Sequence, residues 1–488
     1  MALINISNLT FAYEGSYDNI FENVSFQIDT DWKLGFTGRN GRGKTTFLNL
    51  LQNKYEYSGT ITSPCEYEYF PFGAPDAGRQ TERVIMEIAP GINEWELVRE
   101  LNLLEMDEDA LYRPFSTLSN GERTKALLAA LFLKENRFLL IDEPTNHLDM
   151  LGRKNVSEYL NGKKGFILVS HDRRFLDGCV DHILSINKTN IEIQKGNFSS
   201  WTLNKERNDA FELAENDKLK KDIKRLVKSA REKAEWADKT EASKIGGHAA
   251  DRGYIGHKAA KMMKKSKSIE ARYDKAIEDK SKLLKNIESA DDLKLAQLEY
   301  HSNRLVTLEN VSVFYGAKAA CENISFTIEK GDRIALRGKN GSGKTSLIKL
   351  ICGADMDYTG YFRRGSGLIV SYVSQDTSWL SGSLPDFIEK YGLDESLFKA
   401  ILRKLDFTRV QFDKTIDDFS AGQKKKVLIA KSLCEKAHLL VWDEPLNYID
   451  VISRMQIENL IVEFEPTILF AEHDAAFCEA VANKEVAL

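Results

Sequence analysis

The chain has 488 residues, of which 42% are apolar and 29% are charged, and its formal net charge is −5. At about 100–200 residues per domain, this length predicts two to four domains, and the composition excludes a disordered or collagen-like chain. No stretch approaches the ~18–20 apolar residues that span a bilayer, and the N-terminus has no secretory signal pattern. The six cysteines lack C-x-x-C spacing, which argues against zinc ribbons and disulfides. We therefore expect a soluble, cytoplasmic protein.

The sequence contains one internal repeat. VSFQIDTDWKLGFTGRNGRGKTTFLNLL, around residue 40, recurs around residue 340 as ISFTIEKGDRIALRGKNGSGKTSLIKLI. In the same order, LSNGERTKALLAALFL recurs as FSAGQKKKVLIAKSLC, FLLIDEPTNHLD as LLVWDEPLNYID, and LVSHD as LFAEHD. Motifs that keep their order and spacing indicate a duplicated domain. We expect the two copies at residues 1–201 and 303–488, with a middle segment at 202–302.

Each copy alternates apolar, strand-like stretches with helical patterns. The stretches Trp32–Thr37 and Arg333–Leu336 each lead into a glycine-rich loop and then a helix. Later apolar runs end in polar residues; they are Phe138–Ile141, Phe166–Val169, Leu439–Trp442 and Thr467–Phe470. Strands whose carboxyl ends carry polar groups predict an α/β sheet with its ligand at those ends.

Both copies contain a phosphate loop of the form G-x-x-x-x-G-K-[ST], and two matches in register argue against an ordinary turn. Its glycines let backbone N–H groups wrap phosphates at a helix N-terminus. Lys44 and Lys344 are expected to reach the β- and γ-phosphates, and Thr45 and Thr345 to bind Mg²⁺. The expected nucleotide contacts are Gly38, Asn40, Gly41, Gly43, Lys44, Thr45 and Thr46, and in the second copy Gly338, Asn340, Gly341, Gly343, Lys344, Thr345 and Ser346.

Two acidic pairs follow apolar strands. Asp142 and Asp443 end their strands, where a carboxylate can hold the hydration shell of Mg²⁺. Glu143 and Glu444 come next and are candidates to orient and deprotonate the attacking water. A solvated loop is the alternative for an isolated pair. The position about 100 residues beyond a phosphate loop favours the catalytic interpretation.

Histidine and tyrosine residues add further candidates. His171 and His473 stand at strand ends and are predicted to contact the γ-phosphate, with a structural role as the alternative. Tyr13 and Tyr315 are predicted either to stack on adenine or to pack in the core.

Taken together, these motifs resemble tandem ATP-binding-cassette domains over about residues 1–200 and 303–488. The resemblance implies that two cassettes sandwich two ATP molecules head to tail, so that each signature segment completes the opposite site. Ser119, Asn120, Gly121 and Glu122 would then face Lys344, and Ser420, Ala421, Gly422 and Gln423 would face Lys44. Each signature begins a helix, which directs a positive dipole at the γ-phosphate.

Several positions depart from the family pattern. A glutamine that helps hold Mg²⁺ usually follows the middle strand; the second copy keeps Gln375, whereas the first has Pro71-Phe72. The first signature has Asn120 and Glu122, and the second switch motif has Glu472 in place of serine. We therefore expect two sites that turn over at unequal rates, neither of them inactive.

The middle segment has the pattern of two long antiparallel helices joined by a loop at about 244–257. Residues 202–300 contain no proline, and apolar residues recur at coiled-coil spacing. Residues 218–285 hold 21 basic against 10 acidic residues, which leaves a charge of −16 on the remainder. A basic arm on an acidic body favours a phosphate-backbone partner, and a solvated coiled coil is the alternative.

Two cassettes with a charged helical linker resemble the ABC-F class of ribosome-binding ATPases. HAADRGYIGHKAAKMMKKSK, FSAGQKKKVLIAKSL and WDEPLNYIDV are most similar to its antibiotic-resistance branch of Lsa/Vga type. The resemblance implies a linker that enters the tRNA exit site of the 70S ribosome and approaches 23S rRNA and P-site tRNA. The residues expected to contact RNA or tRNA are Lys244, Arg252, Tyr254, His257, Lys258, Lys261, Lys264 and Lys265.

We therefore predict a monomeric ATPase that uses ATP and Mg²⁺ and protects the peptidyl-transferase centre from lincosamides, pleuromutilins and streptogramin A. We expect no membrane subunit and no DNA partner. The alternatives are a housekeeping ABC-F translation factor, the ATPase of a membrane importer, which would need only a short linker, and a DNA-associated cassette protein, which would show much longer coiled coils or zinc-binding cysteine pairs.

Overall fold

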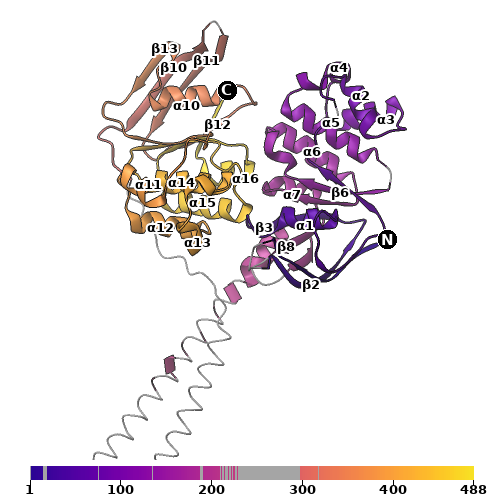
Figure 1. The fold of residues 1–488 in the computed structure, drawn as a ribbon. Coiled ribbons are helices and arrows are strands. Elements are labelled where there is room, and N and C mark those ends of the chain that lie inside the picture. The colour runs from indigo at the N-terminus through magenta and orange to yellow at the C-terminus, as the bar shows by residue number, and fades with distance from the viewer. Residues whose placement is uncertain are drawn as a thin grey trace, which may run out of the picture. The chain divides into compact units, whose positions relative to one another are not determined.

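A computed structural model describes residues 2–14, 19–74, 76–134, 136–186, 191–208, 297–316 and 318–488, with eight further residues between 210 and 228. The chain divides into two units, one formed by Met1–Ser199 with Asp291–Leu488 and the other by Ser200–Ala290. The first unit contains both copies of the repeat (Figure 1). Within the described ranges, no helix is long and apolar enough to cross a membrane.

The first cassette is an α/β domain with two sheets. A parallel sheet has the order β5-β6-β7-β3-β8, extended by the antiparallel β9, and a small antiparallel sheet has the order β2-β1-β4. The elements are β1 (Leu3–Phe11), β2 (Phe21–Asp29), β3 (Lys33–Gly38), α1 (Lys44–Leu51), β4 (Ser58–Thr62), β5 (Glu66–Phe70), α2 (Thr81–Ile88), α3 (Glu94–Leu103), α4 (Asp109–Tyr112), η1 (Phe115–Thr117), α5 (Asn120–Phe132), β6 (Arg137–Asp142), η2 (Pro144–His147), α6 (Met150–Asn161), β7 (Phe166–Val169), α7 (Arg173–Cys179), β8 (His182–Ile186) and β9 (Ile191–Lys195).

The second cassette repeats this plan. Its parallel sheet has the order β14-β15-β16-β12-β17, and its antiparallel sheet the order β11-β10-β13. The elements are β10 (Arg304–Tyr315), β11 (Lys318–Glu329), β12 (Arg333–Arg337), α10 (Lys344–Cys352), β13 (Asp357–Arg364), β14 (Val370–Val373), α11 (Leu384–Tyr391), α12 (Glu395–Lys404), α13 (Arg409–Phe412), η3 (Ile416–Asp418), α14 (Ala421–Cys434), β15 (Leu439–Asp443), α15 (Val451–Phe464), β16 (Ile468–Ala471), α16 (Ala475–Val481) and β17 (Lys484–Ala487). The predicted fold of two tandem α/β cassettes is confirmed.

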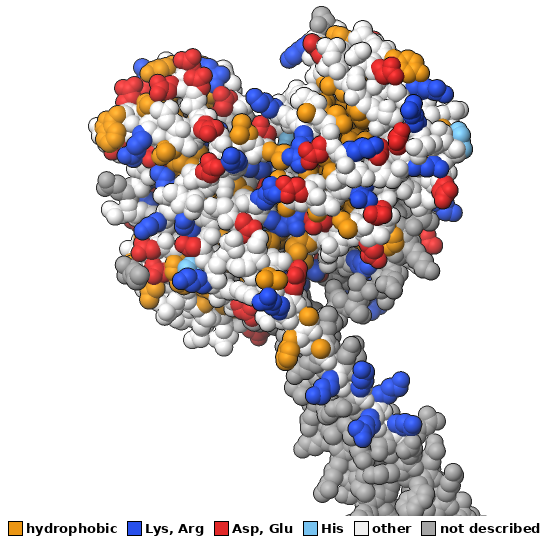
Figure 2. Space-filling view, turned by 180° about the vertical axis from the view of Figure 1, so that it is seen from behind, with side chains coloured by type: hydrophobic (Ala, Val, Ile, Leu, Met, Phe, Trp, Pro, Cys, Tyr) orange, Lys and Arg blue, Asp and Glu red, His pale blue; other side chains and the backbone are white. Residues whose placement is uncertain are grey.

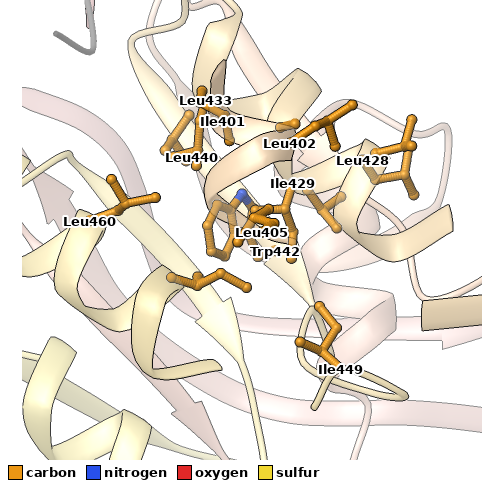
Figure 3. Close-up of a cluster of buried hydrophobic side chains, with 14 of the residues drawn as sticks. Ile401, Leu402, Leu405, Leu428, Ile429, Leu433, Leu440, Trp442, Ile449 and Leu460 are labelled. Carbon is orange, nitrogen blue, oxygen red and sulfur yellow. The ribbon is translucent and has the colours of Figure 1, made fainter. Parts of the chain in front are cut away.

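The central strands are buried on both faces, because helices cover both sides of a parallel sheet. All residues of β7 and β16 are buried. In the second cassette, helices α12 and α14 pack against the sheet through aliphatic side chains that surround Trp442 (Figure 3). The indole Nε1 of Trp442 donates a 2.8 Å hydrogen bond to Ser432 Oγ, which satisfies the only polar atom of this buried ring.

Strand order places the predicted chemistry together. In the first cassette β6, β7 and β3 are neighbours, and in the second β15, β16 and β12 are neighbours. The carboxyl ends of parallel strands meet at one edge of a sheet. The phosphate loop, the acidic pair and the switch histidine of each cassette follow these three strands, so the topology brings them to the same edge.

Candidate nucleotide sites

Each phosphate loop connects a central strand to a helix that begins at the motif lysine. Gly41 and Gly43 have φ angles of 82° and 93°, and Gly341 and Gly343 have φ angles of 82° and 90°, a region that L-residues rarely occupy. A Cβ at Gly43 would lie 2.5 Å from Ile20 Cγ2. The glycines therefore let the loop turn back tightly in front of the helix N-terminus, with its amides free to face an anion.

The two motif lysines are buried and are held by their own loops. Lys44 Nζ donates to Gly38 O at 2.7 Å and to Arg39 O at 3.2 Å. Lys344 Nζ donates to Gly338 O at 2.8 Å and to Lys339 O at 2.9 Å. Burial lowers the pKa of both lysines, and nearby carboxylates only partly oppose it. A phosphate placed in the loop would supply the negative charge that these ammonium groups lack.

A hydroxyl and a carboxylate form the predicted metal position. Thr45 Oγ1 donates to Asp142 Oδ2 at 3.0 Å, and Tyr69 OH donates to the same oxygen at 3.0 Å. Burial raises the pKa of Asp142 and raises that of Asp443 to about 6, with the Thr345 hydroxyl acting in the opposite direction. Mg²⁺ prefers hard oxygen ligands and also binds phosphate oxygens. A carboxylate with too few cations around it, beside a hydroxyl, therefore suits this ion.

The two predicted general bases share a backbone geometry. Glu143 and Glu444 have left-handed φ angles of 51° and 46°, and their N–H groups donate to Val169 O and Ala471 O, both at 2.9 Å. These bonds continue the pairing of the acidic strand with its neighbour. The carboxylates are thereby directed to the edge where the phosphate loop lies.

Their electrostatic surroundings differ. Burial, reinforced by the charge of Asp142, raises the pKa of Glu143 to about 8. Its Oε1 atom lies 3.2 Å from His171 Nε2, and burial lowers the pKa of His171. The first site therefore pairs a neutral imidazole with a carboxyl group that is largely protonated at neutral pH.

The second general base is held by amide donors. Gln375 Nε2 donates to Glu444 Oε2 at 2.8 Å, and Asn447 Nδ2 donates to the same oxygen at 2.7 Å. Burial alone would raise the pKa of Glu444, but the neighbouring His473 and Asn447 outweigh it and hold the pKa below its ordinary value. His473 Nε2 lies 3.7 Å from Glu444 Oε1. The first cassette has Phe72 where the second has Gln375, so Glu143 cannot receive the equivalent bond.

Residues of the second cassette complete the first cavity. A cavity of about 610 Å³ is lined by Lys44, Glu143 and His171 together with the entire second signature, Ser420, Ala421, Gly422 and Gln423. Asn40 Nδ2 donates to Tyr448 O at 2.8 Å, and Arg39 forms a 2.7 Å ion pair with Asp406. Each phosphate loop was predicted to face the opposite signature, and the structure places them so here.

Fewer residues of the opposite signature line the second cavity. It measures about 510 Å³ and is lined by Lys344, Gln375, Glu444 and His473, with Asn120 as the only signature residue. Ser119 and Glu122 form a capping box at the start of α5, as Ser420 and Gln423 do at the start of α14, and Glu122 also forms a 2.6 Å ion pair with Arg113. The predicted contribution of Ser119, Gly121 and Glu122 to this cavity is therefore not seen.

The two tyrosines predicted near adenine are half-exposed and line the cavities. Tyr13 OH is hydrogen-bonded to Thr46 Oγ1 at 2.8 Å, and Tyr315 OH accepts from Ser346 Oγ at 3.3 Å. Neither ring belongs to a buried core, so the core-packing alternative fits them less well than a position beside a ligand.

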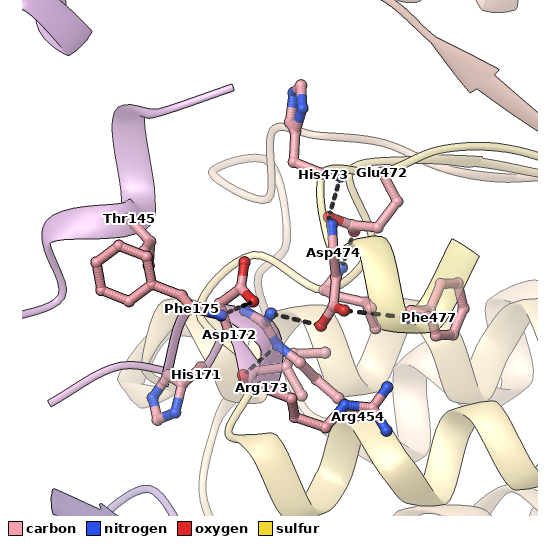
Figure 4. A network of polar contacts seen from close by, with 12 residues as sticks. Thr145, His171, Asp172, Arg173, Phe175, Arg454, Glu472, His473, Asp474 and Phe477 are labelled. Carbon is pink, nitrogen blue, oxygen red and sulfur yellow. Dashed lines mark hydrogen bonds and ion pairs between the residues drawn. The ribbon is translucent and has the colours of Figure 1, made fainter. Parts of the chain in front are cut away.

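Sequence analysis missed several residues around these sites. Two buried ion pairs fix the segments that follow the switch histidines. Arg153 pairs with Asp172 at 2.9 Å, and Arg454 pairs with Asp474 at 3.1 Å (Figure 4). Other missed residues are Tyr69, Asn146, Asp406, Gln411, Asn447 and Tyr448. The repeat carries a usable signal for some of them, because the Arg153/Arg454 and Asn146/Asn447 pairs recur at the offset of the catalytic glutamates.

The predicted RNA-contacting residues, Lys244 to Lys265 as named above, lie outside the described residues, and so does the predicted tip at 244–257. Seven basic residues of the middle segment are described. Lys205 is half-buried, and the other six are exposed: Arg207, Lys218, Lys221, Lys224, Arg225 and Lys228. Figure 2 shows basic side chains gathered on this described part.

The fold and the two cavities define a tandem ATP-binding-cassette protein, in which each phosphate loop faces the opposite cassette. The sequence profile described as ABC transporter matches residues 21–146 and 321–447. The chain therefore belongs to the ABC transporter family.

Individual relatives cover nearly the whole chain. Ribosome protection protein VmlR of Bacillus subtilis is 28% identical over 493 residues, which cover 100% of this chain and 86% of the relative. Energy-dependent translational throttle protein EttA of Haemophilus influenzae is 25% identical over 518 residues, covering 95% of this chain and 88% of the relative. The solved structure of archaeal ribosome recycling factor aABCE1 with stalk protein aP1 is similar with a TM-score of 0.65 at 19% identity, over 98% of this chain and 87% of that chain. That structural similarity concerns the fold.

Proposed function

We propose that the protein is an ABC-F ATPase whose ATP-bound, closed form binds the ribosome. The observation that carries the proposal is the first cavity, where Lys44 and the complete signature Ser420–Gln423 line one space. A nucleotide there contacts both cassettes at once, so its binding energy favours the closed arrangement over any open one. Hydrolysis removes the γ-phosphate contacts and allows the cassettes to separate.

The proposed chemistry follows from the residues of each cavity. Lys44 and Lys344 hold the β- and γ-phosphates, and the loop amides and the signature helix dipole add positive potential. The pairs Thr45 with Asp142 and Thr345 with Asp443 hold Mg²⁺, and Gln375 joins the second pair. When bound, Mg²⁺ neutralises charge on the phosphate oxygens.

The general base in each site is the glutamate that follows the acidic strand. Glu143 and Glu444 accept a proton from the attacking water, and His171 and His473 contact the γ-phosphate. A glutamate in its ionised form can act immediately, whereas a protonated one must first lose its proton. Glu444 therefore performs this step more readily than Glu143 at neutral pH.

The ribosome is proposed as the partner because the basic charge of the middle segment and the names of the relatives both favour it. Segment 202–302 is proposed as the linker between the cassettes, and six of its seven described basic side chains are exposed. The names of two relatives refer to ribosome protection and to translation. A polyanion of the size of rRNA suits a basic arm, and the interaction should weaken as salt rises.

The finer proposal is protection of the peptidyl-transferase centre by the linker tip, against lincosamides, pleuromutilins and streptogramin A. VmlR supports this branch through its name as a ribosome protection protein. EttA supports the second candidate, a translation factor without a resistance role. Drug susceptibility of a Gram-positive host with and without the gene distinguishes them, since only the first candidate raises the inhibitory drug concentration.

Ribosome binding is tested by trapping the ATP-bound state. Glu143→Gln with Glu444→Gln should co-sediment with 70S ribosomes when ATP is supplied, and not with ADP. The matched control adds Lys44→Ala and Lys344→Ala, which should abolish nucleotide-dependent sedimentation while leaving the glutamine substitutions in place. Failure of the double variant to sediment with ATP, despite measured ATP binding, would contradict the proposal.

A further inference from the structure

Three positions behind the second catalytic site differ from the first copy as a set. One lies on the signature helix, one lies two residues after the glutamate of the acidic pair, and one directly precedes the switch histidine. The first copy has short hydroxyl side chains at all three, and the second has a cation, an aliphatic residue and an anion; the pairs are Thr124 and Lys425, Thr145 and Leu446, and Ser170 and Glu472.

In the first cassette these positions form local, uncharged contacts. Thr124 Oγ1 donates to Asn120 O within its own helix at 3.0 Å. Thr145 and Ser170 share a 3.3 Å hydroxyl contact, and Asp172 N donates to Ser170 Oγ at 3.2 Å. None of these bonds reaches the segment after β5, where Phe72 stands in the glutamine position.

In the second cassette Glu472 joins two catalytic segments. Its side chain is 3% exposed. Oε2 accepts from Leu446 N at 3.1 Å, and Oε1 accepts from His473 N at 2.7 Å and from Asp474 N at 3.4 Å (Figure 4). One carboxylate thus ties the turn after Glu444 to the backbone of the switch histidine.

Lys425 reaches the segment that carries the glutamine. It is 1% exposed, and its Nζ donates to Ser374 O at 2.7 Å and to Asp443 O at 3.5 Å. Ser374 directly precedes Gln375, whose amide donates to Glu444 Oε2. The lysine therefore connects the signature helix to the glutamine segment and to the end of the acidic strand.

The charges of Lys425 and Glu472 depend on one another. Burial lowers the pKa of Lys425 to about 8, and Glu472 is the first of the opposing charges, followed by Asp443, Glu444 and Asp376. A buried cation is costly unless anions compensate it, and removing one partner leaves the other uncompensated. The attraction between the two charges explains why both residues differ together from the neutral residues of the first copy.

We propose that Lys425 is a positioning residue of the second ATP site, with Glu472 as its counter-charge. Lys425 sets Gln375 against Glu444 through the Ser374 carbonyl, while Glu472 fixes the switch-histidine segment. The glutamine segment, the general base and the switch segment then move as one body in the second site. This inference rests on the proposed ATPase function and assigns the second site a device that the first lacks.

The test uses the full-length protein with Glu143→Gln, so that turnover reports the second site. Lys425→Thr and Glu472→Ser install the residues of the first copy, singly and together. Each single variant should lower kcat about tenfold or more with a much smaller change in KM, since a misplaced catalytic group slows the chemical step. The double variant should be no faster than Lys425→Thr alone, because removing Glu472 does not restore the bond between Lys425 and Ser374. Lys424→Thr, on the same helix and half-exposed, is the matched control.

A second readout does not require hydrolysis. Trp379 Nε1 donates to Ser374 Oγ at 3.3 Å and to Asp376 O at 3.1 Å, so its emission reports the glutamine segment. Subtracting spectra of Trp379→Phe versions isolates this signal. Lys425→Thr should shift the Trp379 emission, and adding Glu472→Ser should leave that shift in place, because in the described chain Glu472 makes no contact with the glutamine segment.

The outcomes separate the two proposals. If the Glu143→Gln parent binds ATP but hydrolyses none, the proposed ATPase function is wrong, and the Trp379 signal still tests the positioning role. If the parent hydrolyses ATP and Lys425→Thr changes neither kcat nor the Trp379 emission, the positioning role is wrong. A double variant that regains the parental kcat would also overturn it, since charge balance and not the bond to Ser374 would then set the rate.

Discussion

The two nucleotide cavities are lined by equivalent loops and acidic pairs, yet the glutamate proposed as general base lies in different surroundings in each. Glu444 accepts hydrogen bonds from Gln375 and Asn447, and against the effect of burial His473 and Asn447 hold its pKa below the ordinary value. Glu143 lacks the glutamine, and burial and the charge of Asp142 raise its pKa to about 8.

The contacts between the two cassettes, in contrast, favour the first cavity. The first cavity has the complete signature opposite its phosphate loop, with the Arg39–Asp406 ion pair and the Asn40–Tyr448 bond beside it. The second cavity receives only Asn120 from its signature. If the proposed ATPase function holds, these differences predict a division of labour in which the first site holds ATP and keeps the cassettes together, while the second site hydrolyses it.

The largest expected difference is in steady-state ATPase activity. Glu444→Gln should lower kcat by about 10²-fold or more, the range of a lost general base. Glu143→Gln should leave it almost unchanged, because the slower site contributes little to turnover. Glu389→Gln, on an exposed helix position, is the control. Equal losses in the two catalytic variants would break the comparison.

A difference in pH dependence comes next. A base must be deprotonated to accept a proton, so first-site turnover, isolated in Glu444→Gln, should rise about tenfold per pH unit up to pH 8. Second-site turnover, isolated in Glu143→Gln, should stay level over the same range, because His473 and Asn447 outweigh burial and hold the pKa of Glu444 below its ordinary value. Single-turnover rates across this range provide the measurement, and parallel profiles would be inconsistent with the assigned surroundings.

Restoring the missing glutamine should make the turnover rates and pH profiles of the two sites more similar. Phe72→Gln supplies an amide donor where the first cassette has none, which favours the ionised form of Glu143. In the Glu444→Gln background, first-site turnover at pH 7 should increase by about three- to tenfold, and its pH profile should shift to lower pH. Phe72→Leu removes the ring without adding a donor and should leave both unchanged. An equal increase in turnover with leucine would show that removing the ring, and not adding a hydrogen-bond donor, causes the gain.

The smallest effect concerns the contact across the first cavity. Arg39→Ala should weaken ATP binding at the first site by about fivefold, as expected for a partly buried ion pair. Asp406→Ala should have the same effect, and the double variant should be no worse than either single one. Site-specific photolabelling with an azido-ATP measures the affinity. Additive losses would show that the two side chains act separately.

Motif spacing predicted the strands, the phosphate loops and the three groups that gather at each sheet edge. Asp142, Glu143 and His171 follow neighbouring strands, so local sequence and parallel topology suffice to bring them together. The repeat also revealed that Gln375 has no counterpart in the first copy, which led to the expectation of unequal sites.

Other features depend on surfaces that meet only in the folded chain. Asp406 and Tyr448 line the first cavity because the second cassette faces it, and no local pattern marks them. The pKa difference between Glu143 and Glu444 arises from burial and from donors brought by distant segments. Lys425 reads as an ordinary lysine of KKK on the signature helix, and only its contact with Ser374 reveals its position.

The division of labour is tested most directly by one single-turnover measurement. Protein loaded with two equivalents of α-labelled ATP and Mg²⁺ is followed by separating ADP from ATP over time. We predict two phases of equal amplitude, the fast phase abolished by Glu444→Gln and the slow phase by Glu143→Gln. A single phase that both substitutions slow equally would contradict the account.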